Sequence, residues 1–226
     1  MNPKADPASP AETAPLPRTG PANILLIHGG ALGDGILGLP AVFSVRRAFP
    51  RATITLIGHP ERWAWIRPSP VDRILPLEGI SLHRLFLPEG PFPPSVTSLL
   101  GEQDLVISWY GDDVFGKNLQ SLVRGALLFN PFRPAALTEH ASRFFLETLG
   151  PLSIPCTATV PALEAPLPPE ASPEGGPFAV FHPGSGSRNK CWPPENFLRL
   201  AGAVERRLGL PCRYLAGEAD RWIAGH

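Results

Sequence analysis

The run from Asn23 to Gly35 constrains the fold of this chain more than any other segment. A short buried strand, predicted over Asn23–His28, leads into a glycine-rich turn that contains one carboxylate, Asp34. An apolar, helix-like stretch follows, from Ile36 to Phe49. A strand, glycine turn and helix in this order is typical of α/β proteins, whose ligand sites form at the carboxyl ends of strands.

Strands and helices alternate after this unit. Strands are predicted over Asn23–His28, Thr53–Gly58, Asp72–Leu77, Asp104–Trp109 and Ala126–Phe129. Helices are predicted over Gly35–Ala48, Glu61–Ile66, Pro94–Gly101, Val114–Arg124 and Glu139–Leu149. Because a helix interior tolerates proline poorly, Pro40 predicts that the first helix begins near Leu39 or kinks there. The alternation predicts a mostly parallel sheet with right-handed crossovers.

A second strand and glycine loop begin at Phe178. The loop from Gly184 to Lys190 offers backbone N–H groups, two hydroxyls and a lysine, a combination suited to a diphosphate. A helix over Pro194–Leu208 and a strand over Cys212–Ala216 follow. A carboxylate in the first loop and an anion cradle in the second together suggest group transfer from a phosphorylated donor.

These patterns predict four regions. Residues 1–21 form a disordered leader, 22–150 a complete doubly wound Rossmann-like domain, 151–177 a proline-rich linker, and 178–226 a partial second Rossmann-like domain. Two strands and one helix are too few to bury both faces of a parallel sheet. We therefore expect a shortened product, a partner chain that completes the second domain, or a second piece that packs on the first as a lid.

Composition excludes several classes of protein. The chain has 226 residues, and its 20 basic and 20 acidic residues cancel, so the broad basic field of a nucleic-acid binder is not expected. Three widely spaced cysteines without metal-ligand spacing favour a reducing cytosol with free thiols. No run is long and apolar enough for a membrane span, and no signal peptide is predicted.

The two loops resemble glycosyltransferase family 9, the ADP-heptose:lipopolysaccharide heptosyltransferase family. That family opens with a strand and a G-D-x-(apolar)-x-x-x-P-A motif, which Gly33-Asp34 through Pro40-Ala41 matches. Its second motif, h-P-G-a-s-x-x-K-x-W-P, is matched by His182-Pro183-Gly184-Ser185-Gly186-Ser187, Lys190 and Trp192-Pro193, with one residue more before the lysine than the motif has. A weaker match runs from His140 through Gly150.

The resemblance implies a GT-B fold of two Rossmann-like halves with the site between them. It implies transfer of a sugar, with inversion, from a nucleotide-diphosphate donor such as ADP-heptose to a lipopolysaccharide core-type acceptor. The expected place is cytoplasmic, peripheral to the inner face of the inner membrane. No metal or cofactor is expected, because cationic side chains can hold the diphosphate.

The resemblance also assigns roles to residues. Asp34 is the expected general base, and Ser185, Gly186, Ser187 and Lys190 hold the donor phosphates, with Glu218 near the nucleoside. Gly33 is an expected acceptor-binding residue, and so is Asp112, which follows the strand that ends at Trp109 and therefore lies at a carboxyl end. Simpler interpretations stand beside these roles: Asp34 caps its helix, Asp112 and Asp113 are a helix N-cap pair, and Lys190 is a solvated cation. His28 contacts the acceptor or is structural, and the glycines of the first loop allow positive φ.

One part of the family pattern is missing. Family members continue past the matched region with a D-T-G-x-x-H-x-A-A-like motif that lines the nucleotide site, and nothing after Glu218 supplies it. The alternative function is therefore a truncated or degenerate, non-catalytic member that acts as a binding or partner-docking subunit. A dinucleotide-dependent oxidoreductase is disfavoured, because the glycine spacing is not that of the G-x-G-x-x-G fingerprint.

Overall fold

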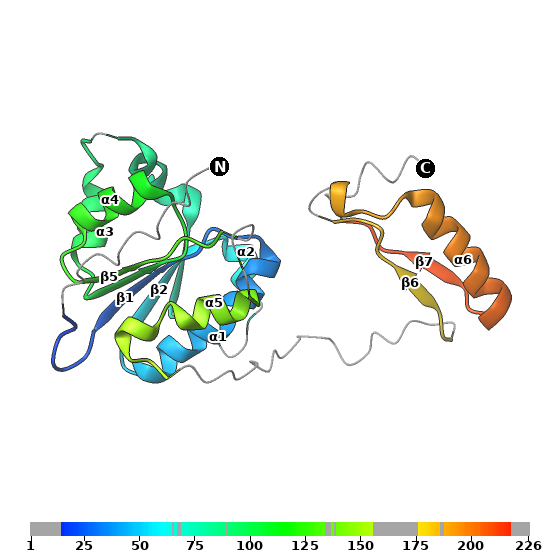
Figure 1. Cartoon of the computed structure of the whole chain (residues 1–226), viewed down its shortest axis with the longest axis horizontal. Coiled ribbons are helices and arrows are strands. Elements are labelled where there is room, and N and C mark those ends of the chain that lie inside the picture. Colours follow the sequence, from blue (N-terminus) through cyan, green and yellow to red (C-terminus); the bar gives the residue numbers. More distant parts are fainter. Residues whose placement is uncertain are drawn as a thin grey trace, which may run out of the picture. The chain divides into compact units, whose positions relative to one another are not determined.

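The computed structural model describes residues 15–64, 66, 69–88, 90–133, 137, 139–155, 176–185 and 188–217. Three predicted site residues, Gly186, Ser187 and Glu218, lie outside these ranges, as do residues 1–14 of the predicted leader and 156–175 of the predicted linker. The chain divides into two compact units, Met1–Pro166 and Leu167–His226, each of which is described by itself (Figure 1). The predicted domain boundaries stay a prediction.

The first unit is built on a five-stranded, fully parallel sheet with the strand order β3-β2-β1-β4-β5. Its strands are β1 (Asn23–Ile27), β2 (Thr53–Gly58), β3 (Arg73–Pro76), β4 (Leu105–Ser108) and β5 (Ala126–Phe129). The central strand is β1, in which Ile24 lies opposite Ile54 on one side and Leu105 on the other. All five predicted strands of this unit are therefore present.

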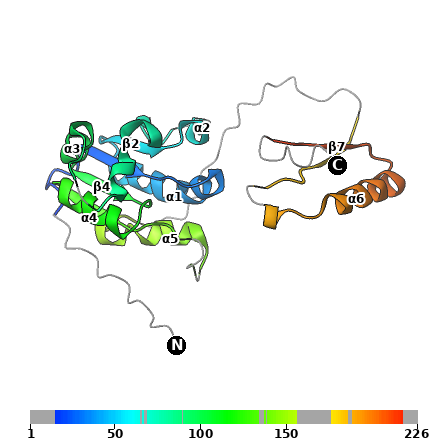
Figure 2. The same ribbon diagram turned by 90° about the horizontal axis from the view of Figure 1, so that it is seen from above.

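Helices cover both faces of this sheet (Figures 1 and 2). The helices are α1 (Leu32–Ala48), α2 (Pro60–Trp63), α3 (Pro94–Gly101), α4 (Asp113–Leu122) and α5 (Ala141–Glu147), with the short 3-10 helices η1 (Leu77–Ile80), η2 (Leu82–Phe86) and η4 (Gly150–Leu152). Helices α1 and α5 pack on one face, and α3, α4 and η2 pack on the other. The first unit is doubly wound, as predicted.

Strand β1 shows how the two layers form. Ile24 and Leu26 belong to the apolar core under α1 and α5, whereas Leu25 and Ile27 belong to the core under α3 and α4. Successive side chains of a strand point to opposite faces, so one continuous apolar run supplies both cores. All four side chains are fully buried.

Helix α1 begins three residues before its predicted start and runs through Pro40, so a start near Leu39 is wrong. A proline inside a helix removes the N–H that would bond the carbonyl four residues earlier, here that of Ile36. Ile36 is 41% exposed, so water can reach this turn of the helix and satisfy that carbonyl. The earlier start places Asp34 inside the first turn of α1.

Asp104, which lies just before β4, joins two strands at their amino-terminal ends. Its Oδ2 accepts hydrogen bonds from the backbone N–H groups of Ala22 at 2.8 Å and Asn23 at 2.9 Å. The carboxylate therefore joins the start of β1 to the start of β4. These are the two strands whose far ends frame the candidate site.

The second unit is smaller. Strands β6 (Ala179–Phe181) and β7 (Cys212–Tyr214) pair in parallel, and α6 (Pro194–Leu208) connects them. Phe181 and Tyr214 lie opposite each other, with ring centroids 5.8 Å apart, and Tyr214 Oη donates to the Phe197 carbonyl on α6. This arrangement is the predicted opening of a second Rossmann-like half.

Candidate functional site

A cleft lies where the direction of the chain reverses across the first sheet. After β1 the chain moves outward to β2 and β3, and after β4 it moves the other way to β5, so the loops that follow β1 and β4 diverge. The cleft between them has a volume of about 430 Å³. It is lined by His28, Gly29, Gly30, Asp34, Phe86, Trp109, Tyr110, Gly111, Asp112 and Phe132.

Asp34 reaches the cleft from the first turn of α1 and is partly exposed. Its Oδ2 accepts a hydrogen bond from the backbone N–H of Ala31 at 3.0 Å. The capping interpretation of Asp34 is thus observed, but it occupies one carboxylate oxygen of a side chain that also lines the cleft. A base and a cap are compatible in this geometry, because the carboxylate has further lone pairs.

Two glycines of the first loop, Gly29 and Gly30, are required for close packing. Gly29, Gly30, Gly33 and Gly35 all lack the positive φ that the sequence suggested, so that expectation is wrong. A Cβ on Gly29 would lie 2.4 Å from the Tyr110 ring, and one on Gly30 would lie 2.7 Å from Cβ of Asp34. Gly33 differs, because a Cβ there would meet nothing within 4 Å.

His28 is buried directly beneath this loop, with only 2% of its surface exposed. Its Nδ1 accepts a hydrogen bond from the Gly30 N–H at 3.3 Å, and its ring packs against Trp63, Trp109 and Phe145. Burial lowers the pKa of His28, against the opposing effect of the nearby Asp34 charge. Burial therefore favours the neutral ring, in which Nδ1 can accept the Gly30 hydrogen bond and so position the loop.

Arg62 is a loop-positioning residue that sequence reasoning missed. It lies on α2, directly after the carboxyl end of β2, and its Nη1 donates to the Gly30 carbonyl at 2.9 Å. The peptide groups of Gly30 are thus bonded from two sides, by His28 and by Arg62. The sequence feature that could have identified Arg62 is its position shortly after a predicted strand, at the end where ligand sites form.

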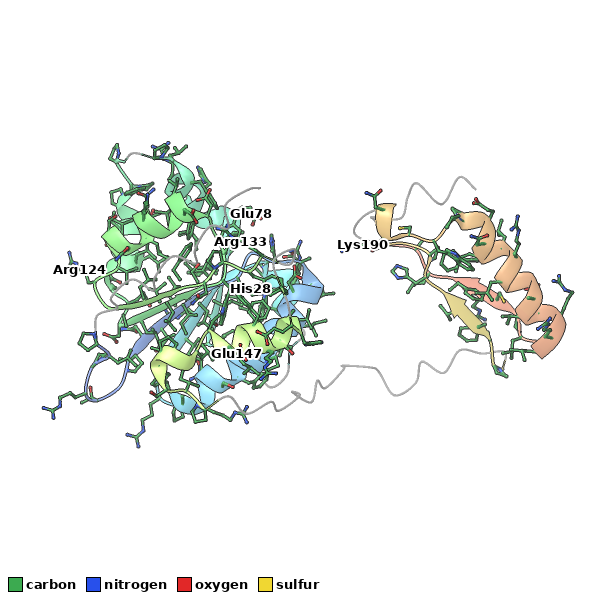
Figure 3. The ribbon with its side chains drawn as sticks, viewed as in Figure 1. His28, Glu78, Arg124, Arg133, Glu147 and Lys190 are labelled. Atoms are coloured by element: carbon green, nitrogen blue, oxygen red, sulfur yellow. The ribbon has the colours of Figure 1, made fainter. Side chains whose placement is uncertain are left out.

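Asp112 enters the cleft at the start of α4. Its Oδ1 accepts the Phe115 N–H at 2.9 Å, so it is the N-cap of that helix. Asp113 forms an ion pair with Arg133 at 3.1 Å. The cap interpretation of Asp112 is therefore observed, and its second carboxylate oxygen has no hydrogen-bond partner among the described residues. Figure 3 places Arg133 and His28 at the same end of the first unit, with Arg124 at the opposite end.

Three aromatic rings that are partly exposed complete the cleft and were not among the predicted site residues: Phe86, Tyr110 and Phe132. Phe86 and Tyr110 meet edge to face, with centroids 5.7 Å apart, and Phe132 stacks on Phe145 at 4.6 Å. Burial, and then the charge of Glu78, raise the pKa of the Tyr110 hydroxyl. Tyr110 directly follows a predicted strand, but Phe86 comes from η2, which the sequence did not predict.

In the second unit, Ser185 lies in the loop after β6, and Lys190 is exposed at the end of η5 (Arg188–Lys190) (Figure 3). Trp192 packs edge to face on Phe197 of α6, with centroids 5.2 Å apart. Because Pro193 and Pro194 lack N–H groups and Glu195 is acidic, the first turn of α6 is a poor anion site. The loop after β6 and Lys190 therefore remain the candidate anion-binding groups of this unit.

Comparison with protein-family models finds no match. Comparison with curated protein sequences also finds none. Among the solved structures, four of the matches with a TM-score above 0.5 are glycosyltransferases.

The glycosyl transferase family 9 structure from Veillonella parvula superposes with a TM-score of 0.61 and 17% identity, covering 90% of this chain and 65% of that one. The structure of E. coli heptosyltransferase WaaC with ADP-2-deoxy-2-fluoro heptose has a TM-score of 0.59 and 18% identity. This match covers 89% of this chain and 73% of that one. The structure of E. coli ADP-heptose lps heptosyltransferase II has a TM-score of 0.53 and 16% identity. This match covers 90% of this chain and 67% of that one.

These comparisons confirm the predicted fold class: the chain has the fold of these glycosyltransferases. The chain spans 65% of the length of the Veillonella structure.

In the described part of the chain, no helix is long and apolar enough to cross a membrane. Within the same ranges, no group of three or more His, Cys, Asp or Glu side chains is arranged to hold a metal ion.

We predict opposite effects for alanine at two neighbouring glycines. Gly30→Ala forces a Cβ into Asp34 and His28, so we expect the free energy of unfolding to fall by about 1–3 kcal/mol. Gly33→Ala is the matched control, and it should leave stability unchanged or raise it by up to about 1 kcal/mol, because alanine favours the helix. Urea unfolding measures both, and equal losses in the two variants would contradict the packing explanation.

We also predict a pH dependence from His28. Because its folded-state pKa is lowered, the stabilisation is present above the unfolded value of about 6.5 and is lost as the pH falls from there towards the folded value. The free energy of unfolding should therefore drop between about pH 7.5 and 5.5. His28→Gln, which keeps an acceptor without a titrating ring, should show a smaller drop, and an unchanged drop would exclude His28 as the source.

Proposed function

We propose that this chain is a glycosyltransferase of the heptosyltransferase type, belonging to glycosyltransferase family 9. It would transfer a sugar from a nucleotide-diphosphate donor such as ADP-heptose to a lipopolysaccharide core-type acceptor, with inversion. The observation that carries the proposal is Asp34, a carboxylate placed by the G-D motif in a cleft at the switch point of a fold shared with heptosyltransferases. The proposed place of action is the cytoplasmic face of the inner membrane, where the chain would bind peripherally.

In this mechanism the acceptor binds in the cleft with one hydroxyl near Asp34. The acceptor oxygen attacks the anomeric carbon as the bond from that carbon to the donor phosphate breaks. The hydroxyl proton passes to the Asp34 carboxylate, and the electron pair of the broken bond leaves with the nucleoside diphosphate. The hydrogen bond from Ala31 N–H holds the carboxylate in place.

The leaving group requires positive charge, which the second unit would supply. Lys190 and the hydroxyls of Ser185 and Ser187 would share the growing negative charge of the diphosphate, with Gly186 allowing close approach and Glu218 near the nucleoside. Support comes from the solved structures, since WaaC has been seen with ADP and with an ADP-linked fluoro sugar. No metal or cofactor is required by this scheme.

The alternative function, a binding or partner-docking subunit, is favoured by the surface of the second unit. Val180 is 53% exposed and Leu215 is 60% exposed. Val180 alternates with Phe181, whose ring meets Phe197 of α6, so Val180 lies on the face of β6 that α6 does not cover. A partner chain that packed against this face of the sheet would bury these side chains.

Asp34→Asn tests the catalytic proposal. The amide oxygen of asparagine still accepts the Ala31 N–H, so we expect the fold to be kept while transfer slows by about 10²–10⁴-fold through loss of the base. ADP release from ADP-heptose with a lipopolysaccharide core acceptor measures the rate. Asp113→Asn, with the same change in charge but no place in the cleft, is the control, and an unchanged rate in Asp34→Asn would exclude Asp34 as the base.

Lys190→Ala separates a donor site from the docking alternative. Calorimetric titration of the full chain with ADP should show binding, and the variant should bind about 10-fold or more weakly, because a charge-assisted contact is removed. Arg207→Ala, which removes another exposed cation at the far end of α6, should bind ADP like the parent chain. If the parent chain binds no ADP, this chain holds no donor site, and the docking function is favoured.

A further inference from the structure

The charges of the groups that line the cleft in the first unit bear on whether a neutral or an acidic sugar can bind there. This step rests on the proposed function for the identity of the ligand as an acceptor. The cleft is lined by aromatic rings, by glycine backbone and by two carboxylates, Asp34 and Asp112. None of the described residues that line it is a lysine or an arginine.

Two helix N-termini point at this cleft, and they must be weighed because such ends attract anions. The starts of α1 and α4 each carry a partial positive charge of roughly +0.5. Each end, however, already carries a carboxylate: Asp34 in the first turn of α1 and Asp112 at the N-cap of α4. Two full negative charges outweigh two half-charges, so the polar rim keeps a net charge on the order of −1.

The arginines at the same edge do not reverse this balance. Arg62 is bonded to the Gly30 carbonyl, behind the loop, and Arg133 is paired with Asp113. Neither side chain lines the cleft. An anionic ligand would therefore meet two carboxylates there without a cation from the described part of the first unit.

The same lining suits an uncharged sugar ring. The partly exposed rings of Phe86, Tyr110 and Phe132 present apolar area and electron-rich faces, against which the C–H groups of a sugar ring can pack. Carboxylate oxygens only accept hydrogen bonds, so they need donors, and sugar hydroxyls are donors. A few polar groups on a mostly apolar wall are typical of a site that orients a small neutral ligand.

We propose that the acceptor unit bound in this cleft is an uncharged sugar ring, held by stacking on the aromatic rings and by hydroxyl contacts to Asp34 and Asp112, and that acidic sugars are discriminated against. The glycine positions explain the access. Because Gly29 and Gly30 have no side chains, the loop packs directly against the Tyr110 and His28 rings. At Gly33, next to Asp34, no atom lies within 4 Å of where a Cβ would be.

Matched pairs of sugars test this inference on the full chain. Methyl glycosides of glucose, galactose and mannose are compared with the corresponding uronic acid glycosides, which differ by one carboxylate. Binding is followed by NMR titration, with the indole N–H of Trp109 as a local reporter, since it is bonded to Thr148 behind the cleft. At low salt we expect at least one neutral glycoside to bind about 10-fold more tightly than its acid, a preference that high salt reduces.

Two variants assign the preference to the cleft. Asn caps a helix as well as Asp does, so Asp112→Asn keeps the fold while removing one charge. We expect it to weaken binding of the neutral glycoside and to reduce its preference over the acid to about 2–3-fold. Glu102→Gln changes the net charge equally at the C-cap of α3, outside the cleft and away from the Arg133 ion pair, and should retain most of the preference.

Equal or tighter binding of the uronic acids would overturn the inference, and so would absence of binding by every sugar in the panel. The proposed function fails separately. A chain that transfers sugar to acidic and neutral acceptors at equal rates keeps the proposed function and overturns this inference. A chain that binds neutral glycosides selectively but transfers to none keeps this inference and overturns the proposed function.

Discussion

Burial of β1 on both of its faces is the constraint on which the rest of the first unit depends. Ile24, Leu25, Leu26 and Ile27 have no exposed surface, so helices must cover the sheet above and below. This places β1 in the centre of the sheet, with β2 and β4 on its two sides. In this sheet the chain leaves β1 towards β2 and leaves β4 towards β5, which are opposite directions, and the cleft lies where they diverge.

The floor of the cleft depends on packing between loops that are distant in sequence. His28 ends the central strand and remains buried and neutral under Gly30, while Arg62 bonds the same glycine from α2. Tyr110, from the loop after β4, fills the space that a side chain at Gly29 would need. The loop that leads into the first turn of α1, and so to Asp34, is therefore held by His28 after β1, by Arg62 of α2 and by Tyr110 after β4.

The two units divide the proposed chemistry between them. The first unit supplies carboxylates and aromatic rings, which suit a base and a sugar acceptor. The second supplies Lys190 and the loop after β6, which suit the phosphates of a donor, because the two prolines at the start of α6 leave that helix end without its first N–H donors.

The sequence by itself determined the alternation of strands and helices, the parallel doubly wound sheet and the position of Asp34 close to the carboxyl end of the first strand. These follow from local patterns, since apolar runs, glycines and prolines act over a few residues. The start of α1 was misjudged because Pro40 is disfavoured locally, whereas core contacts of Leu39, Val42 and Val45 keep the helix intact through it. Only the tertiary structure decided that the first-loop glycines serve packing, that Arg62 holds Gly30, and that Phe86 and Phe132 face the cleft, because those roles depend on neighbours brought together by the sheet.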